Sequence, residues 1–141
     1  MINLKRKMFD KEPDIKVLPR EDKLPFTLAN TVTYYHEGMF CTIEKGFKWN
    51  GSDIPRLLWR IVGSQYDPQF LPASLIHDWM LKNNYLEKHN GVWITTQAFR
   101  LTLLDYGVGN HKANIMAFTV GLIQFIKKVK RKWMEQIETL I

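Results

Sequence analysis

The spacing of the apolar residues changes at Lys45-Gly46, and this change constrains the fold more than any other feature. Before it, the stretch from Thr31 to Glu44 is rich in β-branched and aromatic residues, and Gly38 in its middle suits a hairpin turn. After it, apolar residues recur at the three- and four-residue steps of amphipathic helices. The sequence therefore predicts an α+β fold, with a small antiparallel N-terminal sheet (hairpin at about 31–44) followed by about four helices.

Four helical segments are expected after the sheet. The first begins at Ile54, next to a proline that favours a first helical turn, and the second spans about residues 70–84. The third begins at Thr95 or Thr96. The fourth begins near Asn110 and forms a long helix that projects from the rest.

The fourth segment changes character along its length. Residues 115–126 are apolar almost all round, which predicts burial on several sides. Farther on, the apolar residues narrow to one stripe: Ile126, Val129, Trp133, Ile137 and Leu140. We therefore expect residues 1–126 to form a single globular domain and residues 127–141 to form a basic amphipathic helical extension.

The net charge of +6 is concentrated in that extension, in five cations: Lys127, Lys128, Lys130, Arg131 and Lys132. The simplest interpretation is a solvated helix face. The adjacent apolar stripe raises two alternatives, namely burial against a protein partner or a second copy, and docking on an anionic membrane surface. Nucleic-acid binding needs only the charge, but no recognisable binding motif accompanies it.

Composition limits the class of protein. The 141 residues fit one domain, and 45% hydrophobic residues suffice for a core. Cys41 is the only cysteine, so no internal disulfide or multi-cysteine zinc site is expected, and Cys41 itself is predicted to be a small apolar strand residue. The first residues do not resemble a signal peptide, and no apolar run approaches the roughly 18 residues of a transmembrane helix.

The densest polar cluster combines a loop with a helix. The loop–helix junction is predicted from Asn50, Gly51, Ser52, Pro55 and Arg56. The helix bears His77 and Asp78. If His77 is a catalytic base, Asp78 and Asp53 would support it or share a divalent cation. The structural alternative is a partly buried His77 bonded to a backbone carbonyl, with Asp53 as a helix cap and Asp78 as a surface or loop-anchoring carboxylate.

Two motifs in this region resemble one known family. They are Gly46-Phe47-x-x-Asn50-Gly51-x-x-Ile54-Pro55-Arg56 and Ala73-x-x-x-His77-Asp78, followed by Phe99, Leu103 and Gly107-Val108. They are similar to motifs of small uncharacterised proteins from tailed bacteriophages and prophages, catalogued as a domain of unknown function, over about residues 31–125. The resemblance implies a place in the virion or in the cytoplasm of the infected bacterium. The family has aspartates where this chain has Asn50 and, often, Thr96, while Asp53 stands at a family serine.

The second motif is also similar to the helix of phospholipases A2 that carries Ala-x-x-x-His-Asp. That likeness implies a hydrolase in which His77 is the base and Asp78 holds a calcium ion. In those enzymes a further helix supplies an aspartate that holds the histidine, and here Thr96 replaces it.

Three functional hypotheses follow. The first is a phage- or prophage-encoded, non-catalytic binding or virion-associated protein (tail or accessory) that docks a partner through its C-terminal helix. The apolar stripe and the missing acidic positions favour it. The second is a His-Asp hydrolase, assisted by a divalent cation and acting on an ester or amide. The third is an intracellular host-takeover or anti-defence protein.

Overall fold

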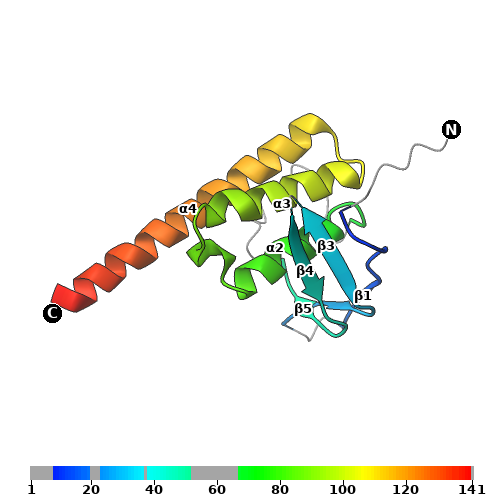
Figure 1. The fold of residues 1–141 in the computed structure, drawn as a ribbon, viewed down its shortest axis with the longest axis horizontal. Coiled ribbons are helices and arrows are strands. Elements are labelled where there is room, and N and C mark those ends of the chain that lie inside the picture. Colours follow the sequence, from blue (N-terminus) through cyan, green and yellow to red (C-terminus); the bar gives the residue numbers. More distant parts are fainter. Residues whose placement is uncertain (1–7, 20–22, 37, 52–66, 141) are drawn as a thin grey trace.

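The computed structural model of the chain describes residues 8–19, 23–36, 38–51 and 67–140. Within these residues two antiparallel sheets come first and three α-helices follow, so the predicted α+β fold is confirmed (Figure 1). The helix predicted from Ile54 lies outside the described residues.

The predicted hairpin is formed by β3 (Val32–His36) and β4 (Met39–Ile43), which pair in antiparallel register. Gly38 in the turn has φ +80°, a conformation that glycine adopts without a steric cost. Side chains alternate between the core and solvent, and Tyr34 and Cys41 are among those that point inward. The hairpin thus buries one face, as a two-stranded unit must to be stable.

A second sheet has the strand order β1–β2–β5. It consists of β1 (Ile15–Val17), β2 (Phe26–Leu28) and β5 (Lys48–Trp49), all antiparallel. The rings of Phe26 and Trp49 lie 5.7 Å apart and bring β5 into the core. Since β5 ends directly before the polar loop, this sheet fixes the point at which that loop starts.

The helix α2 (Leu71–Lys82) lies between the sheets and the other helices. Leu75, Ile76 and Met80 belong to the core shared with the sheets, whereas Ala73 packs with the residues of the later helices. Because both sides of α2 are covered, even its polar residues His77 and Asp78 are buried. The bounds of α2 match the helix predicted for about residues 70–84.

The next helix, α3 (Gly91–Asp105), begins four residues before the predicted start at Thr95. A short 3-10 helix, η1 (Tyr85–Glu87), precedes it. The early start depends on close backbone approach, because a Cβ at Gly91 would lie 2.1 Å from the Tyr85 carbonyl oxygen. Such tertiary contacts override the local polarity of the segment.

The last helix, α4 (Asn110–Leu140), has 31 residues and begins as predicted. At 1.5 Å per residue it is about 46 Å long, and its orange-to-red half extends beyond the other elements (Figure 1). Its inner face packs on α3 through Ala113, Met116, Ala117, Val120, Gly121 and Gln124. The contact is close, because a Cβ at Gly121 would lie 2.8 Å from Thr96 Oγ1.

Burial of residues 115–126 on several sides was predicted, and this prediction is wrong. Five large apolar residues of that stretch are exposed: Ile115, Phe118, Leu122, Phe125 and Ile126. The reason is that α4 lies at the edge of the fold, with α3 on one side and no further element beyond it in the described chain (Figure 1). No helix of the described residues is long and apolar enough to cross a membrane.

Candidate functional site

The helix α2 places two adjacent polar side chains, His77 and Asp78, in the interior. Successive residues of a helix point about 100° apart, so these two meet different neighbours. His77 lies edge-on to the ring of Phe99 in α3, with the ring centroids 5.5 Å apart. Asp78 faces the chain that leaves β5.

Two hydrogen bonds, one helical turn apart, join the end of β5 to α2. Trp49 Nε1 donates to Ser74 Oγ at 2.8 Å, and the Gly51 amide donates to Asp78 Oδ2 at 2.9 Å. Gly51 has φ +68°, a backbone conformation that glycine adopts without a steric cost. Bonds that a carboxylate accepts are stronger than neutral ones, so Asp78 is a loop anchor.

Within the described part of the chain, His77 does not make the carbonyl contact that the structural alternative assigned to it. Among the described residues neither ring nitrogen has a hydrogen-bond partner, and Asp78 Oδ1 has none either. His77 Nδ1 and Asp78 Oδ1 are 3.8 Å apart, which is too far for a hydrogen bond. Buried polar atoms are normally bonded. An imidazole nitrogen in this state can accept a proton, and the carboxylate oxygen can accept one or bind a cation.

The predicted cation site can be placed only in part. Asp53 lies outside the described residues, as do Ser52, Pro55 and Arg56. Within the described ranges no three His, Cys, Asp or Glu side chains gather in a way that could hold a metal ion. Asn50 is half-buried and directly precedes Gly51, so the first part of the predicted junction lies beside α2.

A smaller polar contact joins β4 to η1. Cys41 Sγ and the Tyr85 hydroxyl are 3.3 Å apart in the core. Burial raises the pKa of Tyr85 to about 12, and the hydrogen bond with Cys41 adds to this shift. Burial also raises the pKa of the Cys41 thiol above its ordinary value. A buried thiol held in its neutral form is a poor nucleophile, so Cys41 is a strand residue of the core, as predicted.

The second candidate site is the outer face of α4, the apolar face that is not buried in the core, and part of it borders a groove beside α3. We define it by nine residues: Ile115, Phe118, Leu122, Phe125, Ile126, Val129, Trp133, Ile137 and Leu140. Eight of them are exposed and Ile137 is half-buried. The second half of this face was predicted from the sequence and the first half was not, although the spacing of three and four runs unbroken from Ile115 to Leu140.

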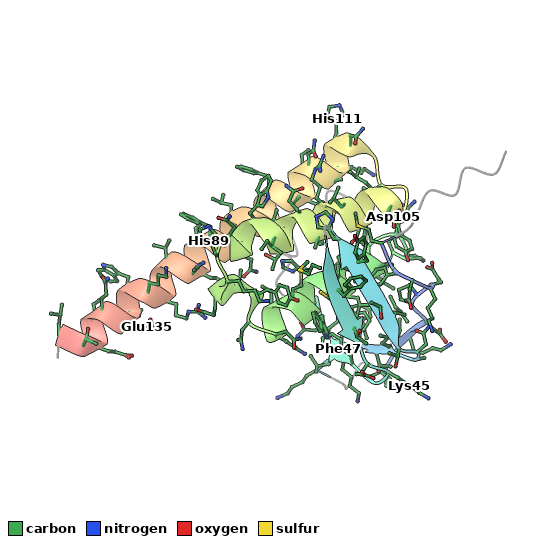
Figure 2. All side chains as sticks on the ribbon, in the orientation of Figure 1. Lys45, Phe47, His89, Asp105, His111 and Glu135 are labelled. Carbon is green, nitrogen blue, oxygen red and sulfur yellow. The ribbon has the colours of Figure 1, made fainter. Side chains whose placement is uncertain are left out.

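The C-terminal half of α4 is strongly basic. α4 carries six basic and two acidic side chains, a net charge of +4 within the +6 of the whole chain. Arg131 forms an ion pair with Glu87 of η1, which connects the projecting half to the body of the protein. The predicted partner-binding residues thus all lie on one helix. Figure 2 shows side chains along its whole length, with His111 near one end and Glu135 near the other.

A groove of about 710 Å³ runs between α3 and α4 beside the outer face. Its apolar wall includes Trp93, Phe118, Leu122, Phe125 and Val129. Its basic residues are Arg100, Lys128 and Lys132, and among the described residues that line it none is acidic. The groove therefore extends the apolar, positively charged surface from α4 onto α3.

Comparison with known proteins places this chain in a family. A family profile described as "Protein of unknown function (DUF1353)" matches residues 26–120, from β2 to the first third of α4. The chain belongs to the DUF1353 family. The matched region contains Gly51, His77 and Asp78 and ends before the projecting half of α4.

Two curated relatives are similar to part of the chain. The uncharacterised protein y4iH of Sinorhizobium fredii (strain NBRC 101917 / NGR234) is 34% identical over 78 residues, which are 55% of this chain and 30% of the relative. The uncharacterised protein y4jT of the same strain is 27% identical over 84 residues, 60% of this chain and 24% of the relative. The aligned part is therefore less than a third of either relative. No solved structure matches the chain.

Proposed function

We propose that this DUF1353 protein is a phage- or prophage-encoded binding protein, associated with the virion and without catalytic activity, that docks a partner through α4. The observation that carries the proposal is the exposure of the outer face. Phe118 and Trp133 expose 71% and 62% of their surfaces. Large contiguous apolar patches on soluble proteins commonly mark interaction sites.

The junction at Asp78 has a supporting role in this proposal. The Gly51 amide and the Trp49 indole hold the end of β5 against α2, and α2 in turn packs on α3. The junction thereby stabilises α2 and α3, the helices that support α4. The phage or prophage origin is supported by the resemblance of the two motifs around Gly46 and His77.

The test compares the full chain with a chain that ends at Ile126, because this truncation removes the projecting half of α4. Both are mixed with purified particles of the source phage or prophage, and association is measured by co-sedimentation. The full chain is expected to sediment with the particles and the truncated chain is not. Equal association of the two would contradict the proposal. The variant E135Q/E138Q, altered on the side of α4 opposite the outer face, is the control and is expected to sediment normally.

A second candidate function is a His-Asp hydrolase with His77 as the base. The observation in its favour is the buried imidazole without a hydrogen-bond partner among the described residues. Titration with calcium, magnesium or zinc, followed by thermal melting, tests it, because a bound cation raises the melting temperature by mass action. No shift with any of the three ions, together with normal folding of His77→Ala, would exclude the cation-assisted form.

A further inference from the structure

We propose that the partner of α4 is an anionic membrane surface, on which the helix lies flat with its outer face toward the lipid. This inference rests on the proposed docking function of α4 and names a membrane surface, in place of a component of the particle, as the partner, so that the vesicle and particle tests distinguish the two. Four observations support it: the straight extent of the outer face, its aromatic residues, the cations beside it and its position on the molecule.

The outer face has the shape that a flat surface requires. Residues seven apart, such as Ile115, Leu122 and Val129, lie on nearly the same side of a helix. The face spans 25 residue steps from Ile115 to Leu140, about 38 Å at 1.5 Å per residue. In the described chain no other element lies beyond α4 on this side (Figure 1). The whole length can therefore touch one plane.

The side chains of this face are those of interfacial helices. Phe118, Phe125 and Trp133 supply aromatic rings, and Trp93 of α3, exposed at 65%, adds another beside them. Tryptophan and phenylalanine on one face of a helix with lysines on the other are typical of helices that lie in the membrane interface. A fluid lipid layer accommodates side chains of such different sizes without a matching pocket.

The positions of the charges favour an anionic surface. Lys130 and Lys132 lie on either side of the outer face, each about 80° from its centre, where their ammonium groups can reach lipid head groups. Glu135 and Glu138 lie on the opposite side of the helix. The charged side chains that flank the outer face, and that an anionic leaflet would meet there, are therefore all positive. A second copy of α4 would instead bring its own net positive charge to the contact, which disfavours self-association through this face.

The test is co-sedimentation of the full chain with vesicles. Vesicles of phosphatidylcholine are compared with vesicles that also contain phosphatidylglycerol. The full chain is expected to bind the anionic vesicles, to bind the neutral ones much less, and to dissociate as salt rises. Absence of binding to anionic vesicles, or equal binding to both kinds, would overturn the inference.

Matched variants assign the binding to the outer face. K130Q/K132Q is expected to lower the partition coefficient by roughly tenfold or more. K11Q/K45Q, with the same change of net charge on exposed lysines outside α4, is the control and should change it far less. V129S/W133S should lower binding as well, and because both side chains are exposed, circular dichroism and thermal melting should remain as in the unaltered chain. Equal losses for the two lysine pairs would show that net charge alone accounts for the binding, against this inference.

Two further outcomes separate this inference from the proposed function. If the vesicles are not bound but the chain ending at Ile126 loses association with phage particles, the membrane inference fails and the docking function stands. If V129S/W133S instead abolishes a dimer seen by sedimentation equilibrium, a second copy covers the face and the membrane inference also fails. If neither vesicles nor particles are bound and no dimer forms, both proposals fail.

Discussion

Asp78 is the residue on which the contact between loop and helix depends. Its position next to His77 in a short motif made it visible in the sequence, and its role as loop anchor was one of the predicted alternatives. The sequence could not show that the Gly51 amide is the donor, because this bond joins residues 27 positions apart. Nor could it show that His77 is fully buried, since burial depends on both neighbours of α2.

Removal of the Asp78 carboxylate is expected to destabilise the fold. In Asp78→Ala the Gly51 amide loses its acceptor, which should cost about 1–3 kcal/mol of the free energy of unfolding, measured by urea denaturation. Asp78→Asn keeps an acceptor oxygen of the same size and is the control. If both variants lost the same free energy, the hydrogen bond would not be the source of the effect.

Because of Tyr85, the stability of the folded protein is expected to change with pH in the alkaline range. Its pKa is about 12 in the folded protein, above its ordinary value of 10.0, because the hydroxyl is buried. The folded state therefore holds this proton more tightly than the unfolded chain does. Its contribution to stability is complete below pH 10 and is lost as the pH rises through 12. Urea unfolding at several alkaline pH values should show this decline, and it should be shallower in Tyr85→Phe.

Helices and strands could be predicted from the sequence where the apolar residues recur at one regular spacing. The hairpin, α2 and the start of α4 follow from alternation, helical spacing and the residues at their ends. The start of α3 does not, because Asn90 and Gly91 look like loop residues until the carbonyl of Tyr85 is placed against them. The exposure of one face of residues 115–126 was also beyond the sequence, because two opposite apolar faces on one helix predict two neighbours and only one is present in the described chain.

Gly91 is the position at which α3 tolerates no side chain. Gly91→Ala would place its Cβ against the backbone of Tyr85 and Leu86, atoms that cannot move aside as a side chain can. We expect a loss of at least about 2 kcal/mol in the free energy of unfolding. Gly109→Ala is the matched control, because in the described chain no atom beyond its two sequence neighbours lies within 4 Å of the added Cβ. Its effect should stay within about 0.5 kcal/mol.

Over the whole molecule, buried residues and positive charge are found in different parts of the chain. None of residues 127–140 is buried, yet they carry five of the six cations of α4. The division of the chain at Ile126 into a domain and an extension remains a prediction. The structure gives it a physical basis, because the hydrophobic core ends at Val120 and burial ends at Gln124.

Truncation should therefore leave the fold intact. A chain that ends at Ile126 loses the ion pair between Arg131 and Glu87, and exposed pairs of this kind contribute no more than about 1 kcal/mol. Its thermal unfolding should remain cooperative, with a melting temperature within a few degrees of that of the full chain. Calorimetry measures both. Broad unfolding or a large drop would mean that the extension belongs to the domain.

The close crossing of Gly121 over Thr96 has a consequence for how α4 folds. A helix that is apolar on two opposite sides can pack on its neighbour in two rotations, half a turn apart. The inner side offers Ala113, Ala117 and Gly121, which allow the backbones to approach, whereas the other side offers Phe118, Leu122 and Phe125, which would hold them apart. The small residues of the inner face therefore determine which side of α4 packs on α3. A bulky replacement at Gly121 would favour the opposite rotation, in which the large apolar residues of the outer face are buried and the inner face is exposed.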